Sequence, residues 1–211
     1  HPGQVLSLAN AFNPADVRAW FERIYKLDER VGRARFVVEP KIDGLTVVLH
    51  YHNGQFVQGA TRGDGEIGED ITANLRTVRS IPLHIPVDPG GPQPPQTLVV
   101  RGECFIHTRD FEALNQRLEE AGERTYLNPR NTAAGSLRQL DPALTAQRPL
   151  TLLTYQVVAA DGPVPEGQWA LLQYLRALGF PVTQHALQCQ DLEQAIEACN
   201  RMAVERDQLP Y

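Results

Sequence analysis

Two apolar runs enclose an acid–lysine–acid segment in residues 36–49, FVVEPKIDGLTVVL. The β-branched composition of both runs predicts two strands, and Asp43-Gly44 marks the break between them. Alternate side chains of an extended segment share a face, so Glu39, Lys41 and Asp43 are expected to project together. A glycine directly after them lets a ligand approach the backbone. The segment therefore predicts a polar site at a strand end.

Lysine is rare in this chain: it occurs only at Lys26 and Lys41, although Lys and Arg together number 20. Arginine stays protonated near neutral pH, whereas a lysine amine can lose its proton and act as a nucleophile. Lys26 lies off the apolar stripe of its predicted helix and is expected to be a surface charge. Lys41 is therefore the candidate nucleophile. The plain alternative is a surface hairpin whose lysine and acids pair in solvent, because Asp-Gly turns are common.

The rest of the chain alternates between hairpins and helices. Asn53-Gly54 predicts a two-residue hairpin turn, and apolar runs predict strands over 97–105 and 150–158. Helices are expected from Pro14, over 108–121, through 169–178 and from Asp191. We therefore expect the α+β class, with mainly antiparallel sheets and flanking helices.

Composition narrows the class of protein. The chain has 211 residues and a formal net charge of −5, and 42% of its residues are hydrophobic. No apolar run approaches the roughly 20 residues of a membrane span.

The 3 cysteines have no C-x-x-C spacing, which argues against a disulfide framework or zinc site and favours the cytoplasm. Cys104 and Cys199 are expected to be small core residues. The acidic balance favours a small-molecule site, or a domain whose DNA contacts lie mainly elsewhere.

Short polar and glycine-rich runs follow one another along the chain. They are 39–44 (EPKIDG), 60–65 (ATRGDG), 68–72 (GEDIT), 101–103 (RGE), 128–131 (NPRN) and 134–139 (AGSLRQ). Together with residues 6–12, LSLANAF, they resemble the bacterial NAD-dependent DNA ligases in order and spacing. One departure is Ala9, where that family usually has Asp.

The resemblance implies a catalytic role for two residues and a recognition role for a third. Lys41 would attack the α-phosphorus of NAD, expel nicotinamide mononucleotide and hold AMP through a phosphoramidate bond. Asp43 would orient or deprotonate the amine, and Glu39 would accept from the adenine 6-amino group.

The remaining residues of the implied NAD site lie in three separate runs. Arg62 and Glu103 would contact the ribose and phosphate region, and Ser7 and Leu8 would line the adenine pocket. Glu103 also stands out by itself, because an acid in an apolar strand is costly to bury without a partner. Arg62 in a glycine-rich turn could instead be a plain surface charge.

Two arginines are implied to contact DNA. If 129–138 is helical, Arg130 and Arg138 share a face and start about 12 Å apart. In the family the matching arginines contact the nicked strand near its 5′ phosphate. The alternative is a solvated helix face.

The resemblance implies an adenylation domain over residues 1–211 with the nucleotidyltransferase (ATP-grasp-like ligase) fold. We expect it to be truncated on its C-terminal side and to lack the upstream domain that binds nicotinamide mononucleotide. The implied function is NAD-dependent DNA ligation: AMP passes to a DNA 5′ phosphate before the nick is sealed. NAD and magnesium are the expected cofactors, and no metal ligand or zinc site is expected in this segment.

The expected partner is nicked double-stranded DNA, bound by a monomeric cytoplasmic enzyme with no membrane contact. The isolated chain is expected to have little or no ligase activity. One alternative is an ATP-dependent ligase or capping-type nucleotidyltransferase, which shares Lys-x-Asp-Gly. Another, of a different class, is a non-catalytic nucleotide- or DNA-binding remnant.

Overall fold

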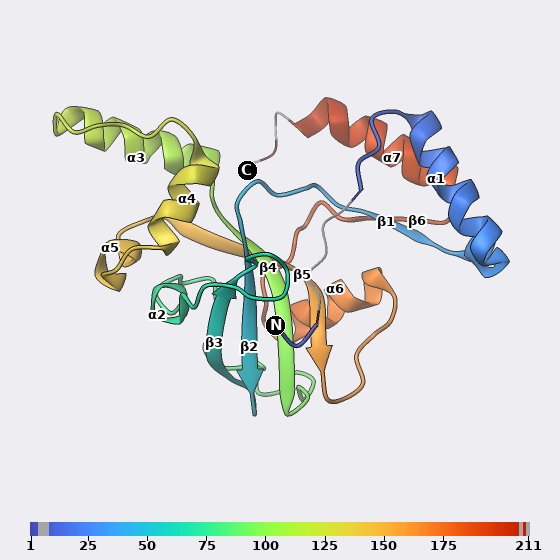
Figure 1. Cartoon of the computed structure of the whole chain (residues 1–211), viewed down its shortest axis with the longest axis horizontal. Helices are drawn as coiled ribbons and strands as arrows, with labels where there is room; N and C mark the ends of the chain where they lie inside the picture. Colours follow the sequence, from blue (N-terminus) through green and yellow to red (C-terminus); the bar gives the residue numbers. More distant parts are fainter. Residues whose placement is uncertain (4–8, 207–208, 210–211) are drawn as a thin grey trace. The chain divides into compact units, whose positions relative to one another are not determined.

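The computed structural model describes residues 1–3, 9–206 and 209 (Figure 1). These residues form two compact units: unit 1 holds 1–3 and 42–182, and unit 2 holds 9–41, 183–206 and 209. Unit 1 contains a four-stranded sheet and unit 2 a two-stranded sheet. The strand pairs in both sheets are antiparallel, so the predicted combination of antiparallel sheets with flanking helices is confirmed.

The sheet of unit 1 has the strand order β3-β2-β4-β5. Its strands are β2 (Leu45–His52), β3 (Gln55–Thr61), β4 (Thr97–Ile106) and β5 (Leu150–Ala160). Asn53 and Gly54 join β2 to β3 with φ angles of 48° and 75°. Both angles are left-handed, which matches the twist of the paired strands and confirms the predicted hairpin turn.

One face of this sheet forms the core of unit 1. Val47, Leu49 and Tyr51 alternate along β2 and are almost fully buried. The ring of Tyr51 meets Phe180 edge-on, with the ring centroids 5.2 Å apart. Helix α6 (Gln168–Ala177) packs against β5 and ends before Gly179, which has the left-handed φ of 95° expected at a helix terminus.

The other helices of unit 1 are α2 (Thr72–Leu75), α3 (Thr108–Glu120), α4 (Pro129–Leu137) and α5 (Pro142–Ala146). Figure 1 shows α3, α4 and α5 gathered beyond one end of the sheet, and α4 packs on β4 and β2. A buried polar chain fixes α4: Asn74 donates to the Thr145 hydroxyl at 2.8 Å, which donates to the Ser136 carbonyl at 2.7 Å. Helix α4 is thus tied to its surroundings by satisfied polar groups as well as by packing.

Unit 2 is built around β1 (Phe36–Val38) and β6 (Leu187–Cys189). Its helices are α1 (Pro14–Leu27), the short 3₁₀ helix η1 (Glu29–Arg33) and α7 (Leu192–Glu205), and α7 packs on both strands. The Asn13 and Asp191 side chains cap α1 and α7, as their sequences predict. No helix in the described part of the chain is long and apolar enough to cross a membrane.

The two cysteines expected in cores differ. Cys104 is fully buried in β4, which confirms the prediction, but Cys199 is exposed, so its core assignment is wrong. Helix α7 instead turns Ala195 and Ala198 toward Cys189 on β6. Successive helical residues are rotated by about 100°, so the residue after Ala198 points away from that core.

We expect Phe180→Ala to lower the free energy of unfolding of the chain by about 3–5 kcal/mol, because it leaves a cavity beside Tyr51. Denaturant-induced unfolding of the 211-residue chain measures this change. Val57→Ala is the control: Val57 is 48% exposed, and its loss should cost less than about 1 kcal/mol. Equal costs for the two variants would contradict this description of the core.

Candidate functional site

The acid–lysine–acid segment lies outside both neighbouring strands. Residues 39–43 form an irregular connection between β1 and β2, where the chain passes from unit 2 to unit 1. Glu39 is half-buried, whereas Lys41 and Asp43 are exposed. Strand alternation therefore does not fix their directions, and the shared face of these three side chains stays a prediction.

Gly44 anchors the end of this segment in unit 1. A Cβ atom added there would collide with the Cys104 carbonyl oxygen and would lie 2.9 Å from the Cβ of Phe105. Only glycine lets the start of β2 approach β4 so closely. The glycine expected to admit a ligand thus admits a neighbouring strand, and this contact fixes the backbone next to Asp43 at the start of β2.

A buried acid lies on the second face of the sheet, opposite the core. Glu103 on β4 pairs in register with Thr46 on β2 and is 6% exposed. The Thr46 hydroxyl donates to the Glu103 carboxylate at 2.9 Å. The Arg62 backbone N–H donates to the Thr46 carbonyl at 3.2 Å. Thr46 therefore joins two of the predicted nucleotide contacts, Arg62 and Glu103.

Tyr155 on β5 extends this polar group. Its hydroxyl donates to the Glu103 carboxylate at 3.4 Å, and the Arg101 guanidinium lies 5.5 Å from its ring centroid. Burial, and secondarily the charge of Glu103, raises the pKa of the Tyr155 phenol above its ordinary value. Tyr155 therefore remains a neutral hydrogen-bond donor to Glu103 across the physiological pH range.

Helix α4 brings Arg130 to Asp43. The Arg130 Nη1 donates to the Asp43 Oδ1 at 2.7 Å, and the two side chains are 48% and 62% exposed. The hydrogen bond to Asp43 raises the pKa of the Arg130 guanidinium. Sequence analysis assigned these residues to different tasks, DNA contact and catalysis, and the structure places them in contact.

Arg138 directly follows α4 and pairs with the glycine-rich loop, residues 62–69. Its Nε lies 3.1 Å from a carboxylate oxygen of Glu69. The turn that precedes Glu69 in this loop has left-handed φ angles of 58° at Gly63 and 104° at Gly65. Within that turn the Asp64 carboxylate accepts from the backbone N–H groups of Glu66 and Ile67, and these bonds lower the pKa of Asp64.

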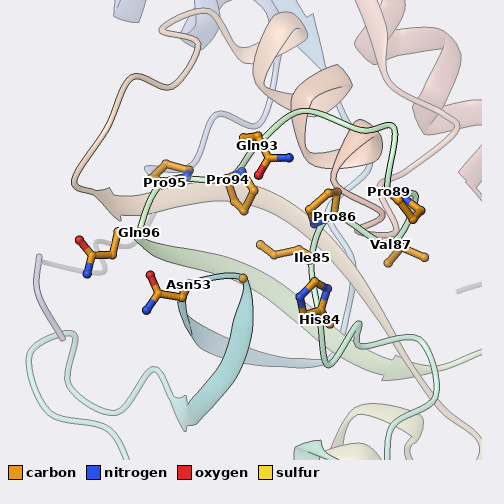
Figure 2. Close-up of a pocket in the computed structure, with 11 residues that line it drawn as sticks. Asn53, His84, Ile85, Pro86, Val87, Pro89, Gln93, Pro94, Pro95 and Gln96 are labelled. Carbon is orange, nitrogen blue, oxygen red and sulfur yellow. The ribbon is translucent and has the colours of Figure 1, made fainter.

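A hollow of about 590 Å³ lies at the other end of the sheet (Figure 2). It lies between the β2–β3 hairpin at Asn53 and the proline-rich connection from His84 to Gln96. Asp43 precedes β2 and Asn53 follows it, so the length of an eight-residue strand, about 25 Å, separates the two places. The hollow is therefore distinct from the group around Asp43 and Glu103.

A family model for the NAD-dependent DNA ligase adenylation domain matches residues 1–211. The chain belongs to this family. Among curated relatives, the chain is 52% identical to a DNA ligase of Chloroflexus aggregans, 49% to one of Roseiflexus castenholzii and 46% to one of Myxococcus xanthus. Each match covers 100% of this chain and 30–32% of the relative, so the chain spans about a third of their length.

In this adenylation domain, the structure brings together some of the predicted site residues. Within unit 1, Thr46 bonds the Glu103 carboxylate through its hydroxyl and the Arg62 backbone N–H through its carbonyl, and Asp43 pairs with Arg130. Glu39 and Lys41 belong to unit 2. Ser7 and Leu8 lie outside the described residues.

Sequence analysis missed two residues of the adenylation domain, Thr46 and Tyr155. Both provide hydroxyl groups to Glu103. Thr46 carried a weak signal, since it is a polar residue within the apolar run 45–49. Tyr155 carried none, because β5 has a register shift beside it that no periodic pattern indicates.

We expect Gly44→Ala to lower the free energy of unfolding of the chain by about 1–3 kcal/mol, because the new methyl group must displace β4. The control is Gly135→Ala in α4, where an added Cβ meets no atom of the described residues within 4 Å. Removing a helical glycine should raise stability by about 0.5–1 kcal/mol. Denaturant titrations of both variants compare the two effects, and a neutral Gly44→Ala would rule out the close contact with β4.

Proposed function

We propose that this chain is the self-adenylylating module of an NAD-dependent DNA ligase. The observation that carries the proposal is the whole-chain match to the adenylation-domain family, together with the place of Lys-x-Asp-Gly in the fold. Gly44 fixes that motif against β4, whose Glu103 is held by Thr46 on the adjacent strand. A lysine on an irregular segment with a carboxylate two residues away suits nucleophilic catalysis at phosphorus.

In the proposed first step, the Lys41 Nζ attacks the α-phosphorus of NAD. The N–P bond forms while the P–O bond to the bridging oxygen breaks, and nicotinamide mononucleotide leaves with the electron pair of that bond. The amine loses a proton in the process, and Asp43 orients it or accepts the proton. The product is AMP joined to Lys41 by a phosphoramidate bond.

The nucleotide contacts form the second part of the proposal. Glu39 accepts from the adenine 6-amino group, and Ser7 and Leu8 line the adenine pocket. Arg62 and Glu103 contact the ribose and phosphate region. Support for the last two comes from their common hydrogen bonding to Thr46 on β2, since Arg62 directly follows β3 and Glu103 lies on β4, the two strands that flank β2.

The later steps require nicked double-stranded DNA, which is a proposed partner of the whole protein. AMP passes from Lys41 to the DNA 5′ phosphate, and the neighbouring 3′ hydroxyl then displaces AMP to seal the nick. Arg130 and Arg138 are the proposed phosphate contacts, and both side chains are about half exposed. Guanidinium groups suit this role because they bind phosphate oxygens with directed N–H groups.

Magnesium belongs to this proposal through the family. Among the described residues, no three His, Cys, Asp or Glu side chains gather to hold a metal ion. The Glu103 and Asp43 carboxylates are engaged by Thr46 and Arg130. The described part of the chain thus does not present a built magnesium site.

The proposal extends to the fold, the oligomeric state and the cellular location. Residues 1–211 are assigned to one adenylation domain with the nucleotidyltransferase (ATP-grasp-like ligase) fold, in a monomeric cytoplasmic enzyme. The family match favours this reading over an ATP-dependent ligase or capping enzyme. The alternative is a non-catalytic nucleotide- or DNA-binding remnant, and an experiment that detects the AMP adduct distinguishes it from a self-adenylylating module.

We expect Lys41→Ala to abolish the AMP adduct in the full-length protein, and Lys41→Arg should do so too, because guanidinium stays protonated. Intact-mass measurement after incubation with NAD detects the adduct. Incubation with ATP in place of NAD should yield none. An adduct that persists in either Lys41 variant would refute the assignment of the nucleophile, and an unmodified wild-type protein would favour the non-catalytic rival.

Arg138→Ala should weaken binding of the full-length protein to a nicked duplex at every sequence tested, because a phosphate contact carries no base preference. The slope of log affinity against log salt concentration should become less steep by about one unit, as expected for the loss of one phosphate contact. Fluorescence anisotropy across a salt series measures both quantities. Arg18→Ala in α1 removes an equally exposed arginine and should keep the wild-type slope; an unchanged slope in Arg138→Ala would remove Arg138 from the DNA contacts.

A further inference from the structure

The ion pair between Arg130 and Asp43 joins two segments that are 87 residues apart in the sequence. Arg130 lies in the first turn of α4, and Asp43 lies two residues after Lys41 on the irregular segment before β2. The Nη1–Oδ1 distance of 2.7 Å is that of a charge-assisted hydrogen bond. Arg130 therefore contacts the Lys-x-Asp-Gly motif directly.

Helix α4, which carries Arg130, is held in place by capping, burial and hydrogen bonds. Asn128 caps its first turn by accepting from the Asn131 backbone N–H at 3.0 Å. Four of its residues are buried: Thr132, Ala133, Ser136 and Leu137. The Asn74 side chain donates to the Gln139 carbonyl just beyond the helix at 2.8 Å. Arg130 is therefore presented from a helix fixed at both ends.

Asp43, by contrast, receives little support from regular structure. It lies outside β1 and β2, and its side chain is 62% exposed. On its C-terminal side the chain is fixed by the contact of Gly44 with Cys104. The backbone next to Asp43 is thus held by glycine packing, while Arg130 restrains the direction of the carboxylate.

Stability alone does not explain this pair. Half-exposed ion pairs typically contribute about 0–1 kcal/mol to folding. Arg18 and Glu193 in unit 2 form a pair of similar exposure, 48% and 60%, through two hydrogen bonds of 2.8 and 2.6 Å. The Arg130–Asp43 pair is joined by one hydrogen bond, and one of its partners lies two residues from the proposed nucleophile.

We propose that Arg130 is a positioning residue for self-adenylylation, and that it acts by holding the Asp43 carboxylate in the direction required beside Lys41. This inference rests on the proposed function and adds a first-step task to a residue proposed to contact DNA. Misplacement of a catalytic group by about 1 Å can lower a rate by about 100-fold. A contact of small energetic value to folding can therefore have a large effect on the rate.

The test is the single-turnover rate of adduct formation from NAD, without DNA, in the full-length protein. Arg130→Ala should lower the rate constant by about 10- to 100-fold, with little change in the NAD concentration that gives half the maximal rate. Arg130→Lys keeps the charge and should recover part of the loss. Arg18→Ala, the matched control, should react at the wild-type rate. A rate within twofold of wild type in Arg130→Ala would overturn the proposal.

A double-mutant cycle separates positioning from a general structural effect. Asp43→Asn removes the charged partner, so adding Arg130→Ala to it should cause little further loss of rate. Losses that multiply would show that Arg130 acts independently of Asp43, and the proposal would fail. The wild-type protein distinguishes this failure from failure of the proposed function: a wild-type protein that forms no AMP adduct from NAD refutes the function, whatever the Arg130 variants do.

Discussion

Eight residue pairs join β2 to β4 in antiparallel register, from Leu45 opposite Cys104 to His52 opposite Thr97. This register puts Thr46 beside Glu103, so a buried carboxylate meets a hydroxyl donor instead of an apolar side chain. It also requires glycine at position 44, because the backbone of β4 occupies the space of a side chain there. A shift of one residue would turn Glu103 toward the core face. The positions of Gly44, Thr46 and Glu103 thus all depend on the pairing of β2 with β4.

Helix α4 adds a second constraint to the same side of unit 1. It packs on β2 and β4 and carries one arginine at each end, and each arginine pairs with an acid from a different loop. Asp43 belongs to the lysine motif and Glu69 to the glycine-rich loop. The pairs are half exposed, so their worth to folding is small compared with the burial of Ala133 and Leu137. The two ion pairs instead restrain the directions of the Asp43 and Glu69 side chains, which lie on loops.

Local structure could be predicted from neighbouring residues. The Asn53-Gly54 turn follows from the left-handed φ angles that its hairpin requires, and the Asn13 and Asp191 caps from the unpaired N–H groups of a first helical turn. Strand composition and helix periodicity gave the antiparallel sheets and flanking helices. The scarcity of lysine and the order of short motifs identified the family and the candidate nucleophile, Lys41, since these signals lie in the residue types themselves.

The sequence by itself therefore determined the local elements, the family and the list of candidate site residues. Only the tertiary structure decided that β1 pairs with β6 and not with β2, that Thr46 and Tyr155 serve Glu103, and that Arg130 holds Asp43. These contacts join segments 52–87 residues apart within unit 1 and opposite ends of the chain in unit 2. Turns and caps are set by steric and hydrogen-bonding preferences within a few residues, whereas distant partners are selected by packing of the whole chain, which no local pattern contains.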